Sequence, residues 1–361
     1  MKTKRKNIFK SLLALTLALI MVLGVAPISE LAGVDWASLF TPKAEALSPT
    51  HRVGDIVEFG SYPQSRVTDS SLVSALNGVS KTWVSYGYYS GDINSTVGSM
   101  RPGDWMKYAD FIYNGTKYRA VNFSQYRPDC THYDTSVDKR SSQYDNGYAP
   151  HSIYYFKYEP LKWRVLDPST GLVLCESIID SQAYSNTIYV ESSFWSDNKY
   201  YNDAEHTHYA NDYATSSIRA WLNDDFYNTA FSSSQKASIL TSELDNKAYL
   251  PSYSKYDSDT TYDKVFLLSW SEIQNTAYGF SSNSARQAKG TDYAKCQGLQ
   301  SYSQYLRSAS GYSDYACIVL SDGDLEYYWS VDYTNRGVRP ALKISNLASE
   351  IFESKLEKLS K

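Results

Sequence analysis

Residues 214–231 read ATSSIRAWLNDDFYNTAF, and few other segments of the chain carry so many large apolar side chains at helical spacing. Its apolar side chains form a single stripe at helical spacing: Ile218, Trp221, Leu222, Phe226 and Ala230. Hydroxyl side chains at 215–217 precede the stripe, where a helix N-cap is expected. The pattern predicts an amphipathic helix that packs against a β-sheet, with Trp221 in the core.

Strand and turn signals precede this helix. We expect a strand from residue 53 that stops at Gly60 and Pro63, followed by a short helix over residues 70–77. The Asn-Gly pair at 114–115 lies between two β-prone runs and predicts a hairpin with a type I′ turn.

A second hairpin and several later elements complete the pattern. The turn residues 168–171 separate LKWRVLD from LVLCESII, and a serine-capped helix is expected at 232–240. A buried strand is expected at 265–269, and short strands between residues 305 and 344. Because the strands come as hairpins and the helices cluster in mid-chain, the fold class is α+β, with mostly antiparallel β-sheets and a few short helices.

The first residues carry export features. Five basic side chains lie within the first ten residues, and the apolar run LLALTLALIMVLGVA follows from Leu12. The run is about 15 residues long, whereas a membrane span needs roughly 20. We therefore expect a signal peptide at 1–46 and a mature chain that is secreted or associated with the cell surface. An uncleaved N-terminal anchor is the alternative.

The rest of the chain is expected to form one domain over residues 47–346 and a helical tail at 347–361. Three polar segments without hydrophobic period are expected to be surface insertions of this domain, near 84–104, 125–154 and 182–212.

Composition limits the partners. The formal net charge is −4, and no basic run follows the first segment, so nucleic acid is not expected as a partner. The chain contains 34 Tyr against 12 Phe and 8 Trp. Tyrosine is favoured on binding surfaces and equally on solvent-facing strand positions, and both interpretations stay open.

The cysteines do not have metal-binding spacing. The four are Cys130, Cys175, Cys296 and Cys317. Cys175 and Cys317 lie in apolar strands, which favours buried free thiols. A disulfide is the alternative, because export permits one.

Several motifs occur in a characteristic order: FGSYPQ, YEPLKWRVLD followed by GLVLCESIIDS, SSIRAWLNDDFYNTAF, VFLLSWSEI and GVRPALKI. Together, over residues 53–344, they resemble the bacterial domain of unknown function six-two-seven-three, found mostly in exported proteins of anaerobic Gram-positive bacteria. The resemblance implies a distant similarity to the C-type-lectin-like fold shared by formylglycine-generating enzymes and the variable proteins of diversity-generating retroelements. In that fold a similar terminal G-x-R segment closes the sheet near the N-terminal strand. Residues 304–311 read QYLRSASG where the family usually has a WWLRSPG-like segment, so no family ligand is carried over.

No residue pattern establishes catalysis, and we expect no catalytic residue, no metal and no cofactor. His206 and His208 would share a strand face and could ligate a metal, but no third ligand can be named. The acidic run at 322–326 could bind calcium, although it equally satisfies a plain β-turn. Arg339 is expected to tie the last strand to a carboxylate.

The aromatic-rich closing segment is the candidate ligand site. Arg307, Tyr312 and Trp329 are the predicted ligand-binding residues, with Arg307 as the polar anchor and the rings stacking on a sugar or a protein epitope. Strand alternation predicts that Tyr327 shares a face with Trp329 and that Tyr328 takes the other.

Three functions remain in view. The first is an exported binding module that displays Tyr- and Trp-rich loops to a glycan or a protein, without catalysis. The second is a structural or surface-display domain without a ligand of its own. The third, least expected, is a metal-dependent or formylglycine-generating-like enzyme.

Overall fold

The computed structural model describes residues 51–87, 106–127, 129–131, 141–190 and 199–345. The predicted signal peptide, most of the insertion near 84–104 and the C-terminal tail lie outside these residues. Within the described ranges, no helix has the length and apolar character needed to cross a membrane.

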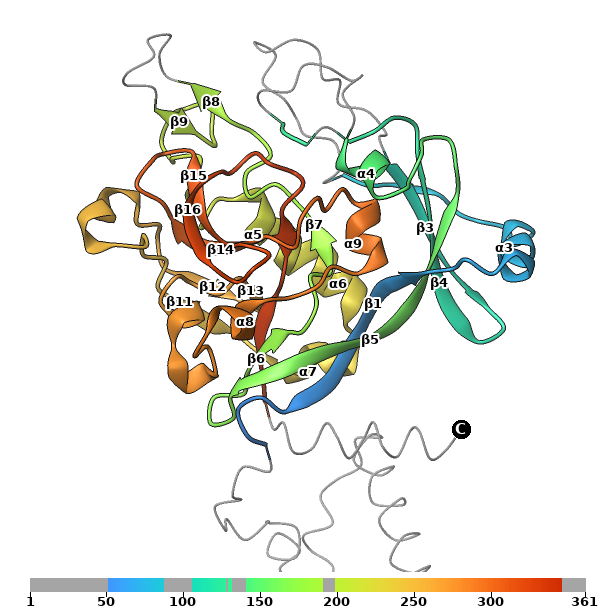
Figure 1. The fold of residues 1–361 in the computed structure, drawn as a ribbon, viewed down its shortest axis with the longest axis horizontal. Helices are drawn as coiled ribbons and strands as arrows, with labels where there is room; N and C mark the ends of the chain where they lie inside the picture. The colour runs from blue at the N-terminus through green and yellow to red at the C-terminus, as the bar shows by residue number, and fades with distance from the viewer. Residues whose placement is uncertain (1–50, 88–105, 128, 132–140, 191–198, 346–361) are drawn as a thin grey trace, which may run out of the picture. The chain divides into compact units, whose positions relative to one another are not determined.

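The larger sheet has nine strands. Its strands are β1 (Ile56–Arg66), β2 (Val84–Ser85), β3 (Met106–Tyr113), β4 (Thr116–Phe123), β5 (Tyr154–Asp167), β6 (Leu172–Cys175), β10 (Ile239–Leu240), β13 (Val265–Phe266) and β18 (Ala341–Ile344). The order is β10-β18-β6-β5-β4-β3-β2, with β1 paired to β5 and β13 to β18. Figure 1 shows β1 and β5 crossing the domain side by side.

The second sheet has five strands and carries the aromatic closing segment. Its order is β16-β15-β14-β17-β7, built from β7 (Asp180–Ser181), β14 (Gln304–Ala309), β15 (Tyr315–Val319), β16 (Leu325–Ser330) and β17 (Gly337–Val338). Two further pairs join β8 (Tyr189–Val190) to β9 (Tyr200–Tyr201) and β11 (Ser242–Leu244) to β12 (Thr261–Asp263).

Among the strands of the described residues, the pairings are antiparallel except that of β14 with β17. This confirms the α+β class with mostly antiparallel sheets and short helices.

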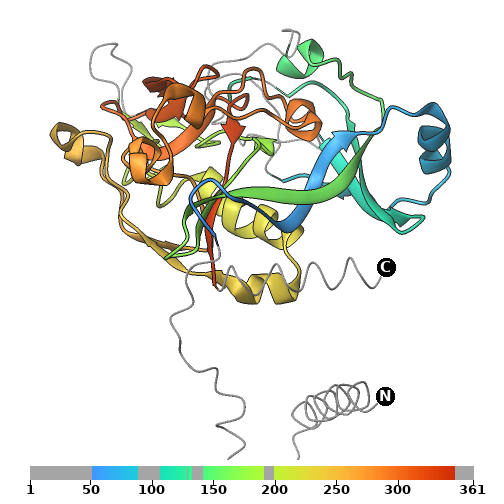
Figure 2. The ribbon, with the colours of Figure 1, turned by 60° about the horizontal axis from the view of Figure 1, so that its bottom comes forward.

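The helix predicted at 214–231 is present and packs as expected. It runs continuously through α5 (Ser217–Trp221), the π-helical turn η2 (Leu222–Phe226) and α6 (Tyr227–Ala230). The Ser216 hydroxyl caps it by accepting a hydrogen bond from the Arg219 amide. All five residues of the apolar stripe are buried. Figure 2 shows this helix along one side of β1 and β5, where the Phe226 ring lies 5.3 Å from that of Tyr62.

The other helices are short: α3 (Ser70–Asn77), α4 (Ser142–Asp145), α7 (Ser233–Ser238), α8 (Asn283–Arg286), α9 (Asp292–Cys296) and the 3₁₀ turns η3 (Pro251–Tyr256), η4 (Glu272–Gln274) and η5 (Thr276–Tyr278). The predicted helix at 70–77 is confirmed. Helix α7 begins with the capping box of Ser232 and Gln235, but the chain turns at Ile239 into strand β10.

The type I′ hairpin is confirmed, because Asn114 and Gly115 both have positive φ, 47° and 75°. The predicted end of the first strand at Gly60 is wrong, since β1 continues to Arg66 through two register shifts. Gly60 has φ 74°, and a Cβ there would lie 2.6 Å from the Phe231 ring. The glycine therefore bends the strand around the core instead of ending it.

Parts of two predicted insertions are buried in the domain. Gln143 and Tyr148 of the 125–154 segment, and Tyr184 and Asn211 of the 182–212 segment, are all at most 3% exposed. Both segments were expected on the surface because their sequences are polar and lack a hydrophobic period. These side chains nevertheless enter the interior because each finds hydrogen-bond partners there.

The partners of Arg339 differ from those expected, whereas the cysteines are as expected. Arg339 donates to the carbonyl oxygens of Cys175 and Arg286, at 2.6 and 2.9 Å, so the expected carboxylate partner is wrong. All four cysteines are buried and none forms a disulfide, as predicted for Cys175 and Cys317.

Candidate functional site

Arg307 is buried and does not reach the surface. Its side chain is 4% exposed, forms an ion pair with Glu272 and donates to the carbonyl oxygen of Leu267 at 2.9 Å. Because both partners belong to the protein, this guanidinium ties β14 to the segment after β13. It is not placed to anchor a ligand.

Tyr312 and Trp329 lie in different surroundings. Tyr312 is 53% exposed in the loop between β14 and β15. Trp329 is half-buried, and the Arg336 guanidinium covers its ring at 4.1 Å from the centroid. Of the two predicted rings, only that of Tyr312 is open on the surface.

Strand alternation fails where β16 faces β15. Ala316 pairs with Trp329 and Ile318 pairs with Glu326, so Cys317 alone faces both Tyr327 and Tyr328. This is a β-bulge, which breaks the alternation of faces. The Tyr327 and Tyr328 ring centroids are 4.2 Å apart, so the expectation that they take opposite faces is wrong.

The two tyrosines of the bulge connect seven aromatic side chains into one group of contacting rings, which we call the tyrosine platform. Its members are Tyr249, Tyr253, Trp270, Tyr312, Tyr315, Tyr327 and Tyr328. Tyr249 stacks on Tyr253 and on Tyr327, with centroid distances of 5.4 and 4.7 Å and interplanar angles of 14° and 16°. Tyr328, 48% exposed, lies 5.7 Å from Tyr312. The stack thus supports two rings that remain about half open to solvent.

Buried contacts hold the loops of the platform. The Tyr249 amide donates to the carbonyl oxygen of Ala309 at 3.0 Å. The buried Asn211 amide donates to the carbonyl oxygens of Tyr312 and Tyr315, at 2.6 and 3.0 Å. Fixed loops lower the entropic cost of binding a ligand.

A glycine permits the closest approach within the platform. A Cβ at Gly311 would lie 2.7 Å from the Tyr253 ring, so glycine lets that ring pack against the loop between β14 and β15.

The platform is uncharged. Burial, then the hydrogen bond with Tyr253, raises the pKa of Tyr249, and the hydrogen bond with Tyr327 raises the pKa of Tyr328. Asp314 lies in the loop between Tyr312 and Tyr315, and burial raises the pKa of its carboxyl group to about 6. The raised pKa values keep the Tyr249 and Tyr328 hydroxyls neutral at neutral pH, where the Asp314 carboxylate is negatively charged.

The side chains of the two segments considered as metal ligands, at 206–208 and 322–326, contact other groups of the protein. His206 stacks on Tyr201, and His208 Nδ1 lies 3.0 Å from Asp203 Oδ2. In the acidic run, the Asp322 carboxylate accepts a hydrogen bond from the Asp324 amide, as in a turn. Within the described ranges, no three His, Cys, Asp or Glu side chains form a group able to hold a metal ion.

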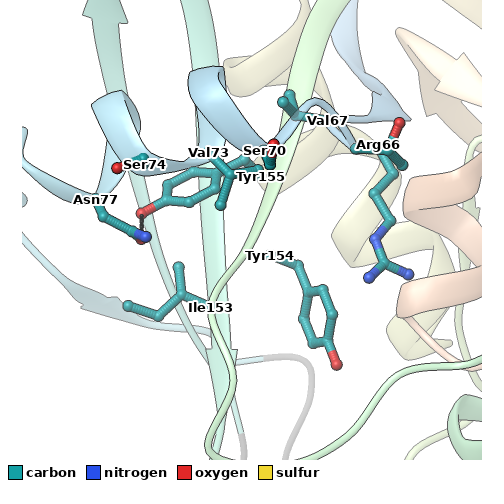
Figure 3. Close-up of a pocket in the computed structure, with 10 residues that line it drawn as sticks. Arg66, Val67, Ser70, Val73, Ser74, Asn77, Ile153, Tyr154 and Tyr155 are labelled. Atoms are coloured by element: carbon teal, nitrogen blue, oxygen red, sulfur yellow. Dashed lines mark hydrogen bonds between the residues drawn. The ribbon is translucent and has the colours of Figure 1, made fainter.

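A groove of about 420 Å³ lies between α3 and the start of β5 (Figure 3). Arg66, beside the Tyr154 ring at 4.7 Å, is the one charged side chain among the residues that line it. The Tyr155 hydroxyl closes one wall by donating to Asn77 at 2.7 Å. Its walls otherwise consist of hydroxyl-bearing and aliphatic side chains, so the groove does not bring together a pair of acid–base groups.

Sequence reasoning found Tyr312 and missed the other side of the platform. Tyr249, Tyr253 and Trp270 precede β14 in the chain by at least 34 positions (304 − 270). The run KAYLPSYSKY at 247–256 carries three tyrosines, but so do the stretches 86–89, 154–158 and 200–209, so tyrosine density did not single it out.

Fold and site together define an α+β domain with an aromatic surface at its five-stranded sheet. Residues 171–346 match a family model described as "Domain of unknown function (DUF6273)". The match supports the family resemblance over β6 to β18, which includes the helix at 217–230 and the whole platform; strands β1 to β5 precede it. No curated protein and no solved structure matches the chain.

Proposed function

We propose that this protein is an exported binding module that holds a glycan or a protein ligand on the tyrosine platform and catalyses no reaction. The observation that carries the proposal is the open pair of Tyr312 and Tyr328, supported from behind by the Tyr249 stack. Exposed aromatic rings on rigid supports are typical of binding surfaces, because they add contact area at little entropic cost.

The proposed location rests on the sequence. The basic start of the chain and the apolar run from Leu12 favour export, and the proposed ligand is accordingly extracellular. We further propose that the domain is distantly C-type-lectin-like, which rests on the motif resemblance. The G-x-R residues 337–339 begin with β17, which pairs with β14 and β7 in the second sheet. The following strand, β18, pairs with β6 and is separated from β1 by β6 and β5, so neither strand lies directly beside the N-terminal strand.

A glycan array and a pull-down from cell walls and secreted proteins, both with the purified chain, test this function. We expect a retained ligand that is lost in Tyr312→Ala and Tyr328→Ala. Tyr262→Ala is the matched control, because Tyr262 is a tyrosine on β12 that is 64% exposed and outside the platform. It should bind as the unmodified chain does.

Absence of any platform-dependent ligand in both assays would contradict the proposal and favour a display domain without a ligand. Binding that depends on Trp329 but not on Tyr312 or Tyr328 would place the site elsewhere on the second sheet.

A further inference from the structure

The exposed part of the platform is small and differs from its support. Tyr249 stacks on two neighbouring rings, those of Tyr253 and Tyr327, at interplanar angles of 14° and 16°. Tyr312 and Tyr328 are the platform residues that are exposed, at 53% and 48%. A ligand therefore meets two adjacent rings, 5.7 Å apart and inclined by 48°.

The charges around these rings disfavour an anionic ligand. No platform residue is basic, and the two lysines that flank Tyr249 and Tyr253 in the chain have partners. Lys247 pairs with Asp257 at 3.2 Å, and Lys255 lies 4.7 Å over the ring of Tyr256. Lys199 is exposed and precedes Tyr200, whose amide donates to the Ser313 hydroxyl beside Tyr312, but it is not part of the platform. Binding of phosphate or carboxylate polymers needs Lys or Arg side chains that can pair with them.

Acidic residues flank the open rings in the chain instead. Glu326 immediately precedes the bulge, with its carboxylate accepting the Tyr327 amide, and Asp314 lies two residues after Tyr312. An acidic polysaccharide would approach like charges with no compensating cation on the platform.

A protein partner would need more surface than these two rings supply. Stable protein interfaces bury about 800 Å² on each side. They also concentrate their binding energy in buried anchors within a wider contact area. A chain of sugar rings, by contrast, can bind through a few stacked residues, because its flat C–H faces contact the aromatic faces while its hydroxyl groups bond to the tyrosine hydroxyls.

From this geometry we infer that the ligand of the platform is a neutral polysaccharide, stacked on Tyr312 and Tyr328; the inference rests on the function proposed above. Since no ion pair contributes, binding should be insensitive to salt.

Affinity electrophoresis of the full chain in gels that contain single polysaccharides tests the ligand class. The probes are a neutral set (glucan, mannan, galactan and xylan) and an acidic set (polygalacturonate and carboxymethylcellulose). We expect retardation by at least one neutral probe. It should persist in about 1 M NaCl, where charges are screened beyond about 3 Å. Tyr312→Ala and Tyr328→Ala should each weaken binding about tenfold, equivalent to ~1.4 kcal/mol, and Tyr262→Ala should not.

The outcomes separate the two proposals. Retardation by acidic probes alone, or a protein partner captured through Tyr312 and Tyr328 with no neutral probe bound, would overturn the neutral-polysaccharide inference and leave the binding module standing. If no probe and no captured partner depends on these rings, both proposals fail. Melting curves of each variant show whether a loss of binding reflects unfolding.

Discussion

The helix core around Trp221 and the tyrosine platform are both clusters of aromatic rings at similar separations, yet they differ in how their polar atoms are satisfied. In the core, the Trp221 indole donates to the Tyr86 hydroxyl at 2.8 Å and the Tyr62 hydroxyl donates to Asp180 at 2.9 Å. On the platform, Tyr312 and Tyr328 are about half exposed. Aromatic clustering alone therefore does not distinguish a core from a binding surface; the exposure of the outermost rings does.

The largest expected effect is in the core. Trp221→Ala removes a fully buried ring that stacks on Phe226 at 5.6 Å. It should lower the free energy of unfolding by about 3–5 kcal/mol. Chemical denaturation of the purified variant measures this. A midpoint unchanged from the unmodified chain would show that the helix at 217–230 is not the main packing element.

A second core test uses pH. Burial raises the pKa of the Asp180 carboxyl to about 7, against the lowering effect of hydrogen bonds from Ser181, Tyr62 and Gln182. In the unfolded chain the ordinary value is about 3.9. Between these values the native state keeps a proton that the unfolded state has lost, so stability falls as pH rises from about 4 to 7, by up to about 1.4 kcal/mol per unit.

Asp180→Asn removes this titration, and its stability should vary less with pH across that window. Denaturation midpoints of both proteins at a series of pH values give the two slopes. Equal slopes would mean that Asp180 is ionised in the folded state at neutral pH.

A third test disturbs the contact between Gly311 and the Tyr253 ring, which supports the platform. In Gly311→Ala, the new methyl group would lie within 3.0 Å of three atoms of the Tyr253 ring, which must move off its stack on Tyr249. We expect a loss of about 1 kcal/mol, at the low end for overpacking because the ring is only half-buried. The near-ultraviolet circular dichroism of the tyrosines should change with it. A variant with the original spectrum and stability would show that the stack does not depend on this contact.

The smallest expected change in stability belongs to the open rings. Tyr312→Ala and Tyr328→Ala should leave the free energy of unfolding within about 0.5 kcal/mol, as for ordinary surface substitutions. Calorimetry of each variant beside Tyr262→Ala tests this. A large loss in stability would assign these rings to the packing of the sheet and remove the basis of the comparison with the core.

Local structure was readable from the sequence wherever neighbours in the chain supply the interaction. The apolar spacing of 218–230, the Ser216 cap, the Asn-Gly turn and the capping box before α7 each involve groups at most a few residues apart. For the same reason the antiparallel class followed from hairpins whose two strands are adjacent in the chain.

The tertiary structure alone decided the site. The stack of Tyr249 on Tyr327 joins residues 78 positions apart (327 − 249). The bulge that turns Tyr328 toward Tyr312 depends on how β16 aligns with β15. Arg307 has a sequence context as polar as that of a surface anchor, and becomes buried because Glu272 and the Leu267 carbonyl oxygen lie within its reach. Periodicity specifies which face of an element a side chain takes, whereas exposure depends on what the rest of the chain packs against that face.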